Sequence, residues 1–409
     1  MEPSWSKVRK GAKGRIKGDR ALWFIIVLLT MFSSVIVYSA TGKLAFNEAD
    51  GKTYVYLFKH LLSILCGFGA ILFIVNVTPI KFYSRLANTA LVASVAFQLL
   101  ATFQHHVLHT ATNRSVSLGL ISFQPAEMAK IALVIFVAKI FSTHREGNYV
   151  SDKGFKKVMI ASFVVIILIA LGDSSTAAIL AFAVFIMMII AGVRVKVYLT
   201  TLAIACAVFG VLITVAPMLP AGTGRVHTVR ERLIDFTQGD DHEKQGTTQR
   251  QYAQLAIYEG GITPFGKGIG NNDVSNYIEA AYSDFIFAII VEEAGVVAAI
   301  LILLAYLIIL FRGGKIAVKA KRSFASFLVA GIVLMYTIQA FMNMFVAVGS
   351  FPVTGQPLPF LSYGGTSMVF TSIAFGIVLM ISESTKEEPA PPSKNLMVIN
   401  DPDEDEELK

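Results

Sequence analysis

Ten apolar runs, most of them close to twenty residues long, constrain the fold of this chain more than any other feature. A helix needs about 20 apolar residues to cross the hydrocarbon core of a bilayer. Hydrophobic residues make up 55% of the 409 positions and charged residues only 15%, which excludes an ordinary soluble domain. The sequence therefore predicts an all-α polytopic membrane protein with about ten transmembrane helices. The runs are Leu22–Thr41, Tyr54–Val77, Leu86–Phe103, Pro125–Phe141, Val158–Leu171, Thr176–Val193, Val197–Leu219, Phe285–Phe311, Phe324–Val348 and Ser367–Ile381.

The net charge of +7 is distributed between the runs in a way that indicates orientation rather than nucleic-acid binding. Basic residues are concentrated before the first run and in alternate loops after it, and the positive-inside rule places such loops in the cytoplasm. Both termini are then expected inside. The basic loops contain Lys81 and Arg85, Arg145 to Lys157, Arg194 and Lys196, and Arg312 to Arg322.

This topology divides the chain into three parts. Residues 1–21 form a basic cytoplasmic segment that leads directly into a full-length span, so no cleavable signal peptide is expected. Residues 22–382 form the membrane domain, with a large external loop at 218–283 between the seventh and eighth spans. Residues 383–409 form an acidic, proline-containing tail in the cytoplasm, where their composition predicts disorder. Cys66 and Cys206 both lie in predicted spans, so no disulfide framework is expected.

Asp284 lies where the external loop runs into the eighth span. A carboxylate in the first turn of a membrane helix is favoured by the helix dipole and lies next to water, so it can stay ionised. Two interpretations follow from the local pattern. Asp284 is either a general base or an ordinary N-terminal cap of the helix.

Glu127 and Lys130 are three residues apart near the start of the fourth predicted span, where Pro125 occupies an N1-like position. They therefore share one helix face. Ionisable groups inside a span are costly unless they are paired or face a cavity. The pair is either functional or a structural ion pair that holds helices together.

Three further segments carry polar signals. The glycine-rich stretch Gly266–Gly270 could bring backbone amides and Lys267 close to a phosphate. Gln339 and Asn343, one helical turn apart, are expected to form hydrogen bonds between helices. The segment 349–367, dense in proline and glycine, can enter the membrane only where protein or a water-filled cavity satisfies its backbone.

These motifs resemble the SEDS family (shape, elongation, division and sporulation) of polytopic peptidoglycan glycosyltransferases. Phe123-Gln-Pro-Ala-Glu-Met-Ala-Lys130 is similar to the family's QPSEFAK, and Gly266-Lys-Gly-Ile-Gly-Asn271 to its GKGxGN. Tyr282-Ser-Asp-Phe-Ile-Phe287 is similar to HTDFIF. The most specific match is Pro357-Leu-Pro-Phe-Leu-Ser-Tyr-Gly-Gly-Thr-Ser367 with Gln339 and Asn343 before it.

Some positions depart from the family pattern. The family's ARRW reads Asn113-Arg-Ser115, so only Arg114 carries over, and its KRQ reads Lys59-His-Leu61. In the external loop Gln249 is retained, whereas a second family glutamine is Tyr252. These departures concern the cations and amides expected to contact substrate, and not Asp284.

The resemblance implies polymerisation of lipid II with inversion and release of undecaprenyl pyrophosphate, with Asp284 as the catalytic base. It implies a positive environment for the pyrophosphate, supplied by Lys130, Arg114, Lys59 or Lys267, with Glu127 orienting Lys130. The substrate-binding residues that the resemblance implies are Lys130, Glu127, Arg114, Lys59, Gln249, Lys267, Ser362 and Tyr363. The sequence requires no cofactor and allows a divalent cation, Mg²⁺ or Mn²⁺, with unknown ligands.

The implied location is the bacterial cytoplasmic membrane, with the active site facing outward. The implied partners are lipid II, the nascent glycan strand, a class B penicillin-binding protein and other proteins of the division or elongation machinery. The acidic tail and the diverged turn Gly172–Ala177 favour a division role over an elongation role. The alternative function is a lipid II transporter, which would need polar groups at mid-membrane and access from both sides.

Overall fold

The computed structural model describes residues 17–48, 50–108, 115–118, 121–147, 149–201, 203, 245–278 and 281–386, and within them the protein is almost entirely helical. The elements are α1 (Arg20–Ala40), α2 (Gly42–Glu48), α3 (Thr53–Val77), α4 (Ile80–Leu108), β1 (Val116–Leu118), β2 (Ile121–Phe123), α5 (Pro125–Thr143), β3 (Arg145–Glu146), β4 (Tyr149–Val150), α6 (Asp152–Gly172), α7 (Ser174–Ile190), α10 (Gln245–Gly261), the 3₁₀ helix η3 (Ser275–Tyr277), α11 (Ile286–Lys319), α12 (Ser323–Ala347) and α13 (Gly365–Ser384). The strands form two short antiparallel hairpins, β1–β2 and β3–β4.

Among the described residues, α1, α3, α4, α11, α12 and α13 are long and apolar enough to cross a membrane. This confirms the predicted class, a polytopic helical membrane protein. Nine of the ten predicted apolar runs coincide with described helices, since α5, α6 and α7 occupy three more of them. The seventh run, Val197–Leu219, and the first part of the external loop lie largely outside the described residues.

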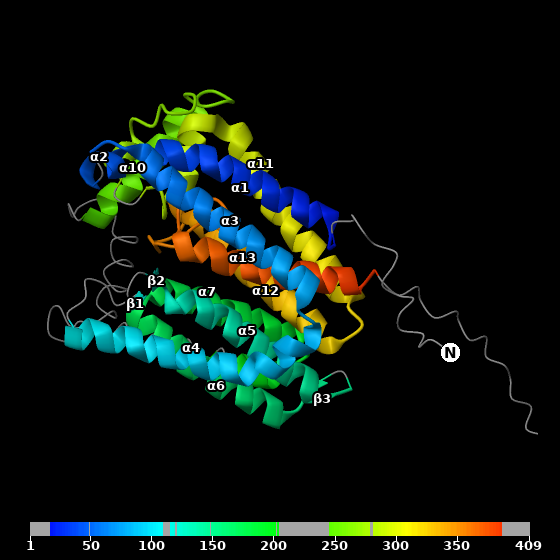
Figure 1. Ribbon diagram of the computed structural model, residues 1–409. Coiled ribbons are helices and arrows are strands. Elements are labelled where there is room, and N and C mark those ends of the chain that lie inside the picture. Colours follow the sequence, from blue (N-terminus) through cyan, green and yellow to red (C-terminus); the bar gives the residue numbers. More distant parts are fainter. Residues whose placement is uncertain are drawn as a thin grey trace, which may run out of the picture.

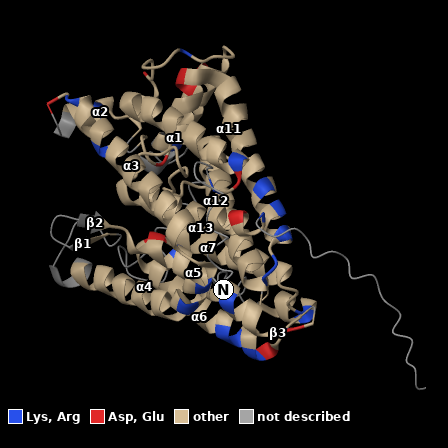
Figure 2. Cartoon of the chain, turned by 45° about the vertical axis from the view of Figure 1, so that its right-hand side comes forward, with Lys and Arg blue, Asp and Glu red and all other residues tan. Residues whose placement is uncertain are grey.

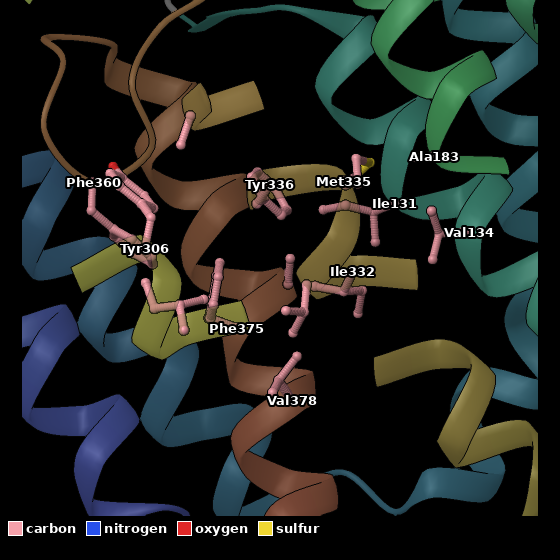
Figure 3. Packing of buried hydrophobic residues seen from close by; sticks show 14 of the residues in the cluster. Ile131, Val134, Ala183, Tyr306, Ile332, Met335, Tyr336, Phe360, Phe375 and Val378 are labelled. Atoms are coloured by element: carbon pink, nitrogen blue, oxygen red, sulfur yellow. The ribbon is translucent and has the colours of Figure 1, made fainter. Parts of the chain in front are cut away.

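Helix α12 lies at the centre of the bundle. Figure 1 shows α4, α5, α6 and α7 grouped on one side of it and α1, α3, α11 and α13 on the other. In the core, Tyr336 and Ile332 of α12 pack between Ile131 and Val134 of α5 and Phe375 of α13 (Figure 3). The rings of Tyr336 and Phe375 have centroids 5.7 Å apart. The core of the bundle therefore connects the two groups of helices through α12.

Helix α11 is interrupted at Gly295, whose φ of 75° and ψ of −173° lie in a region that is almost restricted to glycine. The loop that precedes η3 packs into this break. The backbone N–H of Val297 donates to the carbonyl of Pro264 (3.2 Å), and a Cβ on Gly295 would lie 2.3 Å from that same oxygen. The break thus lets the external loop approach the helix backbone directly.

Gly295→Ala is therefore expected to destabilise the protein by at least about 2 kcal/mol, because the left-handed backbone alone costs about 1–3 kcal/mol for a side-chain-bearing residue. The measurement is the thermal unfolding midpoint of the purified protein in detergent. Gly314→Ala is the matched control, because Gly314 lies in the same helix and a Cβ there would meet no atom within 4 Å. Equal midpoints for the two variants would contradict the assignment of strain to Gly295.

The two ends of the described chain meet at the far end of the bundle from α2 and α10. Asp19 caps α1 by accepting hydrogen bonds from the backbone N–H groups of Ala21 and Leu22, and it forms an ion pair with Arg312 of α11. Its own N–H donates to Ser382 Oγ of α13 (2.8 Å). Asp19 therefore ties α1, α11 and α13 together.

Burial alone would raise the pKa of Asp19, but the hydrogen bonds and charge of Arg312 and the N–H groups of Leu22 and Ala21 hold this pKa below its usual 3.8. Since the folded-state pKa is below the unfolded one, the stabilisation is present above about pH 4 and is lost as the pH falls through the folded value. Asp19→Asn keeps the cap and removes the charge, so it is expected to cost about 1 kcal/mol at neutral pH. Thermal midpoints of wild type and Asp19→Asn should converge as the pH is lowered toward 3. A constant difference between them over this range would argue against the charge as the cause.

Candidate active site

Asp284 lies in a turn directly before α11. The first helical residue is Ile286, and the N-cap position is held by Phe285, which makes no side-chain cap. Asp284 therefore lies one residue before the N-cap position and two before the first helical residue, rather than in the first helical turn as expected. Instead, the hydroxyl of Ser283 donates to Oδ1 of Asp284 (2.6 Å), and the side chain of Asp284 is partly exposed. The carboxylate thus sits on an irregular backbone whose shape must be fixed by other contacts.

Those contacts come from α12 and from the segment between α12 and α13. Nδ2 of Asn343 donates to the carbonyl of Asp284 (2.8 Å) and to the carbonyl of Gln356 (2.7 Å). The hydroxyl of Ser362 donates to the carbonyl of Ser283 (2.6 Å). The Asp284 turn is thus held on both sides, and Asn343 forms its hydrogen bonds with two irregular segments rather than with another helix as expected.

Lys130 and Glu127 form a buried ion pair on α5, with 2.8 Å between Nζ and Oε1 and a Lys130 side chain with no exposed surface. Nζ of Lys130 also donates to Oε1 of Gln339 (2.9 Å) and lies 5.5 Å from the centre of the Tyr336 ring. Nε2 of Gln339 donates to the carbonyl of Pro357 (2.8 Å). The pair is thus connected to the same 356–363 segment that holds the Asp284 turn.

The turn before α7 contributes a third group to this network. Asp173 caps α7 by accepting from the N–H groups of Ser175 and Thr176. Nε2 of Gln356 donates to Oγ1 of Thr176 (2.9 Å) and to Oδ2 of Asp173 (3.3 Å). No sequence motif singled out Gln356. Its only local signal is its place within the proline- and glycine-rich segment.

An aromatic cluster lies beside the turn. The centroid of the Tyr363 ring lies 5.7 Å from that of Tyr282, 6.2 Å from that of Tyr56 and 6.0 Å from that of the His60 imidazole. The ammonium of Lys59 is exposed and lies 5.4 Å from the centre of the Tyr56 ring. The structure therefore brings Lys59, Ser362 and Tyr363 to the side of the Asp284 turn that faces α3.

Lys267 has a different environment from the one that the glycine-rich motif suggested. Its ammonium forms ion pairs with Glu259 and with Glu292 (3.4 Å). The hydrogen bond to Glu259 holds the pKa of Lys267 above its usual value, and burial offsets part of this increase. The backbone N–H groups of Lys267 and Gly268 donate to the carbonyls of Glu292 and Glu293 (both 2.9 Å). These amides are used by the interrupted helix rather than presented to a phosphate.

Gln249 and Arg114 are the two remaining predicted site residues. Gln249 lies on α10, with an intermediate exposure. Helix α10 is attached to the end of α12 by Arg250, whose Nη2 donates to the carbonyl of Gly349 (2.8 Å). Arg114 lies outside the described residues.

For a divalent cation, the test is whether carboxylate and imidazole groups converge. In the described ranges, no three His, Cys, Asp or Glu side chains lie close enough together to hold a metal ion. The divalent cation therefore stays a prediction.

Taken together, the fold and the site define a polytopic helical membrane protein with a polar network at one end of its bundle, built around a carboxylate turn and a buried Lys–Glu pair. The sequence profile of the FtsW, RodA and SpoVE family, described as cell cycle protein, matches residues 19–387. The chain belongs to this family, which confirms the SEDS resemblance of its motifs.

Known proteins of similar sequence match this chain along nearly its whole length. Stage V sporulation protein E of Bacillus subtilis is 29% identical over 373 residues, which cover 90% of this chain and 98% of the relative. The probable peptidoglycan glycosyltransferase FtsW of Geobacter sulfurreducens is 29% identical over 374 residues, covering 91% and 96%.

Solved structures share the fold. The rod shape determining protein RodA of Thermus thermophilus matches with a TM-score of 0.62 at 21% identity, over 92% of this chain and 100% of that one. A structure described as "Structural coordination of polymerization and crosslinking by a peptidoglycan synthase complex" matches with a TM-score of 0.69 at 22% identity, over 91% and 100%.

Proposed function

We propose that this chain is a peptidoglycan glycosyltransferase that polymerises lipid II into glycan strands at the outer face of the bacterial cytoplasmic membrane. The observation that carries the proposal is the Asp284 turn, held by Asn343 and Ser362 at one end of the bundle and joined through the 356–363 segment to Lys130. A lipid-linked sugar lies at this depth, where the membrane meets water.

The residue types suit the reaction. The 4-hydroxyl of one GlcNAc attacks the anomeric carbon of the strand's MurNAc, the bond to the pyrophosphate oxygen breaks with inversion, and undecaprenyl pyrophosphate leaves. A sugar hydroxyl is a weak nucleophile until a base removes its proton, and the proton goes to the Asp284 carboxylate. The hydrogen bond from Ser283 orients that carboxylate.

Positive charge is needed where the pyrophosphate leaves. Of the proposed cations that the structure describes, Lys59 is the best placed to reach it, because its side chain is exposed beside the aromatic cluster. Lys130 is buried, so it acts on the site through Gln339 and the 356–363 segment. Glu127 orients Lys130. Lys267 is the weakest of these candidates because two carboxylates already neutralise it.

The finer topology belongs to the same proposal: ten spans, both termini in the cytoplasm, and the external loop on the same side as Asp284. Basic residues support this orientation, because Figure 2 shows most Lys and Arg of the described chain toward the end of the bundle opposite α2. We assign the chain to division, in partnership with a class B penicillin-binding protein, on the strength of the FtsW names of its relatives.

The test is reconstitution of the purified full-length protein in vesicles with lipid II, with and without the partner transpeptidase. The expected product is a ladder of glycan strands on a gel. The same vesicles are assayed for movement of lipid II between leaflets. Movement without any polymer, even with the partner present, would support the transporter alternative and reject the proposal.

A further inference from the structure

A pocket lies at the end of the bundle opposite the Asp284 turn. It has a volume of about 620 Å³, within the range of about 300–1,000 Å³ that ligand sites occupy. Its walls come from the ends of α3, α4, α12 and α13 and from the turn between α11 and α12. The lining residues are Lys17, Val75, Pro79, Ile80, Lys81, Ala320, Lys321, Arg322, Ala325, Met380, Glu383 and Ser384.

The charge of this pocket is strongly positive. Among the described residues, four bases line it, against one carboxylate, Glu383; the bases are Lys17, Lys81, Lys321 and Arg322. That carboxylate is already used, since its Oε2 accepts from the N–H of Gly18 (2.6 Å) and lies 3.5 Å from the ammonium of Lys386. Even without Lys321, the described lining of the pocket therefore carries more positive than negative charge.

The position of the pocket and its apolar walls indicate the kind of anion. Val75, Ile80, Ala325 and Met380 form an apolar surface beside the basic groups, at the ends of four spans where acyl chains meet headgroups. Trp23, in the first turn of the neighbouring α1, donates its indole N–H to the carbonyl of Lys17 (2.9 Å). Tryptophan with its N–H directed to the polar side is typical of the membrane interface.

We propose that this pocket binds the phosphate headgroup of an anionic phospholipid, with Lys321 and Arg322 on the phosphate and Val75 and Met380 against the glycerol and upper acyl chains. Basic residues that only determine the orientation of a membrane protein need not line a cavity. Here the basic side chains line a cavity that also has an apolar wall. The inference rests on the orientation proposed above, which places this end of the bundle in the inner leaflet.

The experiment is native mass spectrometry of the full-length protein in detergent, titrated with phosphatidylglycerol or with phosphatidylcholine. Lys321→Gln/Arg322→Gln is expected to weaken phosphatidylglycerol binding by on the order of tenfold to thirtyfold, since each basic residue near an anionic headgroup contributes about fivefold in affinity. Lys315→Gln/Lys319→Gln is the matched control, with the same charge change outside the pocket, and should bind as wild type does. Lys81→Gln, at an exposed position, serves if the double variant fails to fold.

Three results would overturn the proposal. One is an equal loss of phosphatidylglycerol binding in Lys321→Gln/Arg322→Gln and in the control variant Lys315→Gln/Lys319→Gln. Another is complete displacement by millimolar inorganic phosphate, which would assign the pocket to a free anion. The third is a large gain in lipid binding on removal of residues 387–409, which would assign it to that acidic segment. Because lipid binding is measured without lipid II, failure here leaves the proposed polymerase activity untouched, and failure of that activity leaves this measurement valid.

Discussion

Asp284→Asn is expected to lower the rate of glycan polymerisation from lipid II by about 10²–10⁴-fold, the usual contribution of a positioned general base. The amide has nearly the same shape and can still accept the hydrogen bond from Ser283, but it cannot take the proton of the attacking hydroxyl. The backbone of the turn should be unchanged, because Asn343 and Ser362 bind its carbonyls rather than its side chain. The measurement is the initial rate of strand formation by reconstituted protein.

Two further variants make this result specific. Asp273→Asn removes an exposed carboxylate from the same external loop and should leave the rate unchanged. Ser283→Ala removes the hydroxyl that orients Asp284 and should cost about tenfold to a hundredfold, since a hydrogen bond to a charged group contributes about 1.5–3 kcal/mol. If Asp284→Asn polymerised lipid II at the wild-type rate, the base assignment would be rejected.

Lys130→Met is expected to destabilise the protein by about 3–5 kcal/mol, because it leaves the buried carboxylate of Glu127 without its partner. Oε2 of Glu127 already accepts no hydrogen bond from the described part of the chain, so the protein has little to offer in place of the ammonium. The thermal midpoint of the purified variant in detergent gives the measurement.

The double variant Lys130→Met/Glu127→Gln separates structure from function. Removal of both charges should restore most of the lost stability, since a buried pair can often be replaced by neutral groups at little cost. Polymerisation should stay low if the ammonium serves the reaction through Gln339. Recovery of both stability and wild-type activity in the double variant would show that the pair is purely structural.

The helical part of the fold was predictable because it depends on local composition. Apolar length alone located nine helices, and the expected hydrogen bond between helices is formed by Gln339, which accepts from Lys130 of α5. The predicted eighth run begins at Phe285, one residue before α11, but the shape of the turn at Ser283 and Asp284 was not predictable. Their carbonyls are held by residues far away in the sequence, and no local pattern reveals such contacts.

The glycine-rich loop illustrates the same limit. Gly266–Gly270 has the composition of an anion-binding turn, and Lys267 would suit a phosphate. What decides its use is the break at Gly295, which frees carbonyls of α11 that these amides then satisfy. Whether a cluster of glycines serves a ligand or another backbone depends on the tertiary partner, and only the structure identifies that partner.

The break at Gly295 also affects how α11 unfolds locally. Because the helical geometry is interrupted there, the nine residues before it are bound to the external loop and the polar network, whereas the remainder runs to Arg312 and its ion pair with Asp19. We expect amide hydrogen exchange to report two cooperative units within this one helix, with the boundary at Gly295. Fluctuations of the loop near the Asp284 turn can then occur without unwinding the other half of the helix, which is long and apolar enough to cross the membrane.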